Sequence, residues 1–151
     1  MKINIYDDLI GYEQCSVAEM SELAPVHLSL DERVPGVPGR AFELKSWHRA
    51  WKQRHETDES REPVIMKVEA VDEFQAAIPW EQLNKAVFLY ELDGKPLQKG
   101  FPIRLYVPDG SSECLNVKSV VTIRFLYAGA AGEATYGFKN SVPIEDLRRK
   151  K

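Results

Sequence analysis

The sequence has few of the features that identify common functional classes. Its 151 residues include two cysteines, Cys15 and Cys114, which are too few for a disulfide framework. There is no CxxC pair, no HExxH motif, no glycine-rich loop of the GxGxxG or GxxxxGK[ST] type and no GxSxG elbow. These absences exclude the standard motifs of zinc sites, nucleotide-binding loops and serine hydrolases.

Long apolar runs and an excess of positive charge are also missing. No apolar run approaches the roughly 20 residues that cross a bilayer. Acidic residues interrupt "MKINIYDDLIGYEQ", where a signal peptide would need an apolar run. The net charge of −3 gives no reason to expect nucleic-acid binding, and the terminal "RRKK" is predicted to be a solubilising tail. We therefore expect a cytoplasmic protein with free thiols, which binds neither a membrane nor a nucleic acid.

The apolar pattern predicts more strands than helices. With 44% hydrophobic and 28% charged residues, the chain is an ordinary globular protein of one domain, residues 1–151. Alternation and β-branched residues predict strands at several places. The predicted strands are "MKINIY", "VHLSL", "VIMKVEAV", the start of "DEFQAAIPWEQLNKA", "VFLYEL", "FPIRLYVP" and "NVKSVVTIRFLYA". We expect turns at "DERVPGVPGR" and "DGKPL" and a Gly-rich connection at "GAAGEATYGF".

The predicted helices are short. Ser16, followed by Glu19 three residues later, has the spacing of a capping box and predicts a helix over Val17–Leu23. In "AFELKSWHRAWKQRHE" the apolar spacing predicts the end of a strand that continues into an amphipathic helix. A short helix is expected near Pro79, and "SVPIEDL" is predicted to form a helical turn. The fold class is therefore α+β, with mixed or antiparallel sheets and short peripheral helices.

Four segments in the second half of the chain resemble the molybdopterin-binding domain of the sulfite oxidase family. They occur in the family's order and at similar spacing: "DEFQAAIPWEQL", "FLYELDGKPL", "KGFPIRLYVPDG" and "VKSVVTI". The first half is similar only in outline, through "SVAEMSELAPVHLSL" and "GRAFELKSWHRAW". The resemblance implies a sulfite-oxidase-type molybdopterin-domain fold with mixed sheets.

The resemblance also implies a set of residues that bind an anionic cofactor. Arg104 matches the arginine of the family's "PxR" segment, and Lys118 matches the lysine of its "VKW" segment. Lys99 stands where the family has a histidine that faces the cofactor, and Ser119 replaces the tryptophan. Lys99, Arg104 and Lys118 are therefore the predicted cofactor-binding residues, with molybdopterin or another small anion as the ligand.

The residue that holds the metal in the family is absent. Family enzymes bind molybdenum through a cysteine thiolate just after the strand that corresponds to "VHLSL", but residues 27–33 contain no cysteine. A thiolate is a soft ligand that holds the metal and helps to set its redox potential, so serine or aspartate is no equivalent. We therefore expect no bound metal. Cys114, between the "PxR" and "VK" segments, is the one substitute ligand considered.

Each of these residues also has a simpler interpretation. Arg104 could be an outward-facing strand residue paired with an acid such as Glu91. Lys118 could be a solvated edge lysine, and Lys99 a solvated charge in a turn. The cysteines could be buried small side chains. His48 and His55, seven residues apart and without a third ligand, are predicted to be surface residues rather than metal ligands.

Three functions follow from these alternatives. The first is a binding or accessory domain that keeps an anion or pterin pocket and has no sulfite oxidase activity. The second is a molybdenum oxidoreductase that transfers oxygen atoms with a non-standard ligand such as Cys114. The third is a structural interaction domain whose pocket is closed by side chains. The first is the leading hypothesis, and it makes the chain a binder rather than an enzyme.

Overall fold

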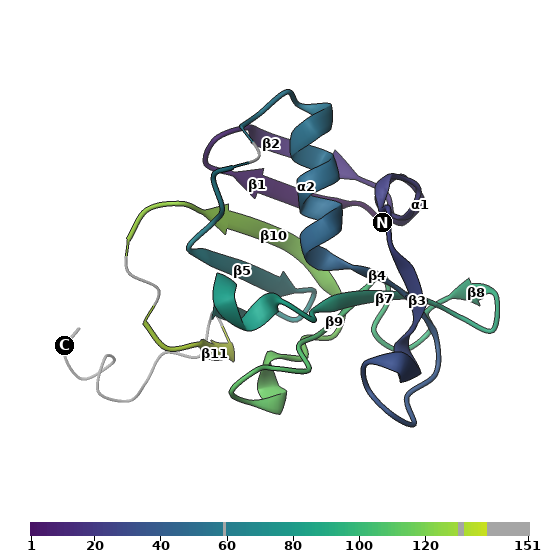
Figure 1. Cartoon of the computed structure of the whole chain (residues 1–151). Coiled ribbons are helices and arrows are strands. Elements are labelled where there is room, and N and C mark those ends of the chain that lie inside the picture. The colour runs from purple at the N-terminus through teal and green to yellow at the C-terminus, as the bar shows by residue number, and fades with distance from the viewer. Residues whose placement is uncertain (59, 130–131, 139–151) are drawn as a thin grey trace.

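Two β-sheets frame the structure, which is a computed structural model that describes residues 1–58, 60–129 and 132–138 (Figure 1). The larger sheet has six strands in the order β11-β6-β5-β10-β1-β2. The smaller has five, with β3, β4, β7 and β8 in order and β9 paired to β7. The strands are β1 (Ile3–Asp7), β2 (Gly11–Cys15), β3 (His27–Ser29), β4 (Arg40–Glu43), β5 (Ile65–Ala70), β6 (Phe74–Pro79), β7 (Val87–Leu92), β8 (Lys95–Pro96), β9 (Arg104–Tyr106), β10 (Val120–Leu126) and β11 (Thr135–Phe138).

The strand directions make the larger sheet mixed. β1 lies parallel to β10 although more than 100 residues separate them, whereas β5, β6, β11 and β2 pair antiparallel to their neighbours. The smaller sheet is antiparallel throughout. The described helices are α1 (Val17–Leu23), α2 (Leu44–Arg54) and the 3₁₀ turns η1 (Leu30–Glu32), η2 (Trp80–Leu83) and η3 (Glu113–Leu115). The predicted α+β class is thus confirmed.

Local sequence signals explain several element boundaries. The Ser16 hydroxyl accepts a hydrogen bond from the Glu19 N–H at 3.0 Å, and the Glu19 carboxylate accepts one from the Ser16 N–H at 2.9 Å. This capping box confirms the predicted helix over Val17–Leu23. At the β7–β8 hairpin, Asp93 and Gly94 both have positive φ, 55° and 75°. Two such residues make the tight turn that suits the twist of a hairpin.

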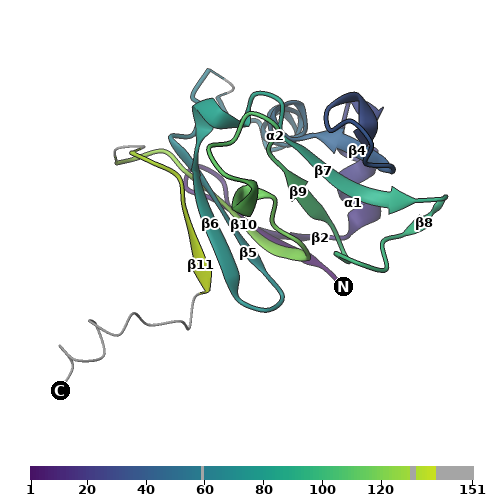
Figure 2. The ribbon, with the colours of Figure 1, turned by 90° about the horizontal axis from the view of Figure 1, so that it is seen from below.

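The main hydrophobic core lies between the sheets and under α2. Figure 1 shows α2 across one face of the larger sheet, and Figure 2 shows β7 and β9 beside β10, β5 and β6. Trp47 and Trp51 of α2 are fully buried, and their rings stack with centroids 5.8 Å apart. Phe42 and Phe88 join them from the smaller sheet. The strand end and amphipathic helix predicted within residues 41–56 are confirmed by β4 and α2, which each cover the same core with one side.

A second apolar cluster covers the other face of the smaller sheet. Successive strand residues point to opposite faces, so Ala41 and Leu89 lie opposite the main core. The loop after β3 closes over them, and Gly39 makes this possible with a φ of 126°. A Cβ on Gly39 would collide with the Leu89 side chain, so the loop packs tightly at this point. The buried members of this second cluster are Leu30, Ala41, Val87, Leu89, Leu97 and Tyr106.

The prediction for residues 129–138 is wrong in part. Instead of a connection throughout, the segment includes the strand β11, which pairs with β6 and extends the larger sheet. Gly137 breaks the apolar pattern, and the pairing partner lies far away in the sequence, so the local residues do not indicate a strand. The strand β2 was likewise not predicted. "SVPIEDL" lies outside the described residues. No helix in the described part of the chain is long and apolar enough to cross a membrane.

The capping box gives a direct test of local stability. We expect Ser16→Ala to lower the free energy of unfolding by about 1 kcal/mol, because the Glu19 N–H in the first turn of α1 loses its acceptor, the Ser16 hydroxyl. Ser21→Ala, within the same helix, is the matched control. Its hydroxyl only bonds back to the Ala18 carbonyl, so its loss should change stability little. Urea unfolding measures both, and equal effects would contradict the role of the cap.

Candidate functional site

Arg104 lies on β9 with its side chain turned away from the main core. Ile103 and Leu105 on either side belong to that core, so Arg104 and Tyr106 face the second apolar cluster. The Arg104 guanidinium carbon lies 4.9 Å from the centroid of the Tyr106 ring. Its Nε atom is buried and has no hydrogen-bond partner among the described residues. A buried guanidinium N–H without an acceptor is costly in a folded protein, as are the buried indole N–H groups of Trp47 and Trp51, which also lack a partner among the described residues.

The alternative pairing of Arg104 with Glu91 is not present. No ion pair joins the two side chains in the part of the chain that the structure describes. Gly100 instead packs against Arg104. A Cβ atom added to Gly100 would lie 3.3 Å from the Arg104 Cδ. With a φ of 83°, Gly100 turns the chain so that it runs closely past the arginine.

Lys118 lies in a different surface groove. The segment around Arg104 runs beside the segment around Lys118, with the Leu105 N–H bonded to the Val117 carbonyl at 2.9 Å. The exposed Lys118 nevertheless lines a groove of about 210 Å³ together with Asp72, Phe74, Cys114, Asn116 and Val117. Arg104 and Lys99 do not line this groove. The structure therefore brings Lys118 next to Cys114 rather than next to Arg104, and their roles in binding stay predictions.

Residues 27–33, where the resemblance would place a metal-binding cysteine, form β3, η1 and the start of the next loop. Leu30, the first residue of η1, is fully buried in the second apolar cluster, and Asp31 is exposed. Cys15 is buried at the end of β2, where its thiol donates to Glu13 Oε1 at 3.1 Å. Burial and the neighbouring Glu13 carboxylate raise the pKa of Cys15 to about 12, so the thiol stays protonated. No group of three or more His, Cys, Asp or Glu side chains suited to a metal ion occurs among the described residues.

The sequence did not reveal a buried polar network around Asp7. Asp7 Oδ2 accepts from the Tyr127 hydroxyl at 2.8 Å and lies 3.0 Å from His48 Nε2, while Asp7 Oδ1 accepts from the Leu9 N–H at 2.8 Å. His48 is only 2% exposed and stacks on Phe125, with ring centroids 4.0 Å apart. The prediction that His48 is a surface residue is therefore wrong, because Phe125 of β10 packs against its ring.

The ionisation states of this network follow from burial and hydrogen bonding. Burial alone would raise the pKa of Asp7, but hydrogen bonds from His48, Leu9 and Tyr127 outweigh it and lower the pKa. Burial lowers the pKa of His48, although Asp7 opposes this shift. Burial and the Asp7 carboxylate raise the pKa of Tyr127 far above its usual value. The network thus holds an ionised aspartate, a neutral imidazole and a neutral phenol near pH 7.

His48 also belongs to a basic stripe on α2. Lys45, His48, Arg49 and Lys52 recur at the i, i+3, i+4 and i+7 positions of one helix face, and all four line a hollow of about 280 Å³. The spacing is visible in "KSWHRAWK" and could have been found from the sequence. The stripe was missed because the tryptophans between its members indicate the buried face of the same helix.

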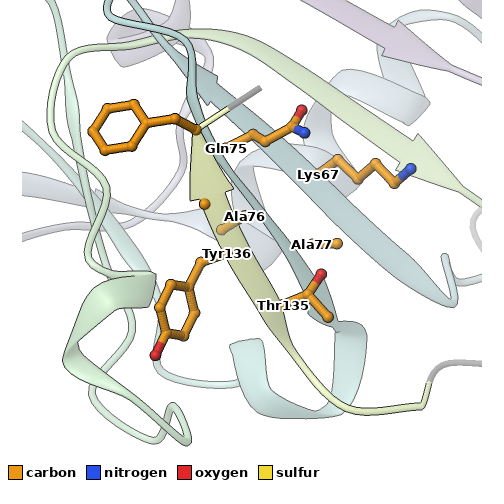
Figure 3. A pocket seen from close by; sticks show the side chains of 8 residues that line it. Lys67, Gln75, Ala76, Ala77, Thr135 and Tyr136 are labelled. Carbon is orange, nitrogen blue, oxygen red and sulfur yellow. The ribbon is translucent and has the colours of Figure 1, made fainter. Parts of the chain in front are cut away.

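Another hollow, of about 320 Å³, lies at the outer edge of the larger sheet (Figure 3). Lys67, Gln75 and Thr135 contribute polar groups from β5, β6 and β11, whereas the ring of Tyr136 points away from Lys67. The depression arises because Gly137, which has no side chain, stands opposite Gln75. Its lining has no pair of titratable groups in hydrogen-bond contact, so it carries no chemical assignment.

The comparisons with known proteins add no family. A scan against protein-family models gives no match, and no curated protein matches the sequence. The resemblance to the molybdopterin-binding domain remains a prediction from the residues, and function has to be argued from the sites themselves.

The His48 pKa predicts how stability depends on pH. Since the pKa of His48 is lower in the folded protein than its ordinary value of 6.5, the unfolded chain binds a proton more readily below about pH 6.5. The contribution of neutral His48 to the free energy of unfolding should therefore be complete above pH 6.5. It should decrease as the pH drops from 6.5 toward the pKa of His48 in the folded protein. Urea unfolding between pH 5 and 8 measures this decline.

Two variants isolate the contribution of His48. His48→Gln, which keeps an N–H for Asp7 and cannot titrate, should flatten the decline between pH 6.5 and 5. His27→Gln removes a histidine that bonds to the Tyr90 hydroxyl instead, and it should leave the decline in place. A decline that persists unchanged in His48→Gln would show that other groups cause it.

Proposed function

We propose that this chain is a small cytoplasmic binding domain of the sulfite oxidase molybdopterin-domain type, which binds an anionic ligand through Arg104 and has no oxidase activity. The supporting observation is the buried Nε of Arg104, which has no hydrogen-bond partner among the described residues. A guanidinium group presents a planar set of donors that matches phosphate oxygens, so a phosphate-bearing ligand such as a pterin phosphate is the natural partner.

The residues present fit an anion better than they fit a metal. Arg104, and to a lesser degree the exposed Lys99, would hold the anionic part of a molybdopterin. Lys118 lines a separate groove and would contribute only at a distance. The metal would need a thiolate beside the cofactor, and residues 27–33, where the resemblance would place that cysteine, contain none. In the family the cofactor supplies oxygen-atom transfer, and no step of that chemistry is assigned to this chain.

A second candidate is an interaction domain without a ligand. It is supported by the second apolar cluster, which fills the face of the smaller sheet on which Arg104 lies. If the cluster and the Tyr106 ring together satisfy Arg104 through packing and the cation–π contact, no anion is needed there. The two candidates differ in whether an anion changes the stability of the folded protein.

Cofactor content separates the binding domain from a molybdenum enzyme. After expression in a host with an intact molybdopterin pathway, we expect the purified protein to contain pterin without stoichiometric molybdenum, because Arg104 can hold an anion and no thiolate is placed for the metal. Pterin fluorescence and elemental analysis measure the two quantities. Stoichiometric molybdenum would reject the proposal in favour of an oxidoreductase that uses another ligand, with Cys114 the first residue to replace.

Thermal unfolding tests the role of Arg104. A ligand that binds only the folded state at 100 times its dissociation constant stabilises it by about 2.7 kcal/mol, so phosphate at high concentration should raise the melting temperature. We expect Arg104→Ala to lose much of this rise. Arg124→Ala removes an exposed arginine from the larger sheet and should keep it. No rise in the unmodified protein would favour the interaction domain, and equal rises in both variants would show that the anion binds away from Arg104.

A further inference from the structure

Lys45 of α2 lies between two hollows on the surface of the protein. It lines the hollow beside α2, of about 280 Å³, and together with Trp80 and Asn84 it lines a wider hollow of about 460 Å³. The wider hollow falls within the range of about 300–1,000 Å³ that is usual for sites that bind small molecules. The amino group of Lys45 is therefore placed where a small molecule can reach it.

Neutral groups hold this amino group in place. Lys45 Nζ donates a hydrogen bond to Asn84 Oδ1 at 2.5 Å and lies 4.8 Å from the centroid of the Trp80 ring. Within the described ranges, Lys45 forms no ion pair with a carboxylate at 4 Å or less. A hydrogen bond to a neutral amide favours the ammonium form less than an ion pair would. The surroundings thus orient the amine without fixing its positive charge.

Burial and the charged neighbours act on the same amine. Burial lowers the pKa of Lys45, the Glu62 carboxylate on the segment before β5 opposes this shift, and Arg49, one turn later on α2, adds to it. Glu62 is engaged elsewhere, since its Oε2 accepts a hydrogen bond from Trp80 Nε1 at 3.0 Å. Glu81 of η2 lines the wider hollow but forms no ion pair with Lys45. A partly desolvated lysine beside another cation is the usual setting of a nucleophilic amine.

We propose that Lys45 is a nucleophilic lysine that binds a small aromatic aldehyde covalently as an imine. The neutral amine attacks the carbonyl carbon, a C=N bond replaces the C=O bond, and the two amine hydrogens leave with the carbonyl oxygen as water. Nothing is oxidised or reduced, so the step needs no further reactant.

The Trp80 ring decides in favour of an aromatic ligand. It lines both hollows and lies directly beside Lys45 Nζ, so it offers a surface on which a planar ring attached to the imine can pack. Arg104 lines neither hollow, and the site therefore does not depend on the proposed anion site.

Reductive trapping of the whole chain tests the proposal. After reaction with salicylaldehyde and sodium cyanoborohydride near neutral pH, peptide mapping by mass spectrometry gives the labelling rate of each lysine. We expect Lys45 to react several-fold faster than the exposed Lys67 and Lys95, because more of its amine is neutral and the hollow retains the aldehyde. In urea, where the hollows are lost, the three rates should become equal. A preference for Lys67 and Lys95, or a preference for Lys45 that survives in urea, would overturn the proposal.

Two isosteric variants test the environment of the amine while Lys45 itself is kept. Asn84→Asp replaces the neutral acceptor by a carboxylate, which favours the ammonium form and should slow the labelling of Lys45 several-fold. Gln53→Glu adds the same charge to α2 but outside both hollows, and it should leave the rate nearly unchanged. Asn84 and Gln53 are exposed, so both variants should fold. Equal rates in the two variants would show that the contact with Asn84 does not control the amine and would reject the site.

Discussion

The Asp7 carboxylate is the buried charge on which the arrangement of α2 against the larger sheet depends. It lies at the end of β1 and accepts hydrogen bonds from the Leu9 N–H and from Tyr127, which follows β10, while it holds His48 of α2. A buried carboxylate is tolerated only when its oxygens are satisfied, so these three donors have to be brought together. The network therefore joins the parallel pair β1–β10 to the helix that covers it and fixes the rotation of α2 about its axis.

The rotation of α2 about its axis determines which of its side chains face the main core and which face the segment before β5. With His48 turned toward Asp7, Trp47 and Trp51 enter the main core, and Lys45, Arg49 and Lys52 turn toward the segment before β5. The hollow beside α2 is thus a consequence of the same packing that builds the core. Arg104 has a different origin, since it lies on the far face of the smaller sheet beside the second apolar cluster. Arg104 does not line the hollow beside α2.

Much of the local structure could be predicted because it depends on neighbouring residues. The capping box of Ser16 and Glu19, the Asp93–Gly94 turn and the step from β4 into α2 each arise within a few residues. Elements that depend on distant partners were not found in this way. β11 is recognisable as a strand only through its pairing with β6, and the burial of His48 depends on Phe125, which lies 77 positions later in the chain.

The amino-acid sequence by itself determined the α+β class, the short helices and the cationic residues from which an anion site could be built. The tertiary structure decided which of those cations share a site. Lys118 and Arg104 lie on neighbouring segments joined by a backbone hydrogen bond, but Arg104 does not line the groove of Lys118, whereas Arg61 lines the same hollow as the stripe on α2. The physical reason is that periodicity specifies the face of an element, while the partner of that face depends on long-range packing and on the satisfaction of buried charges such as Asp7.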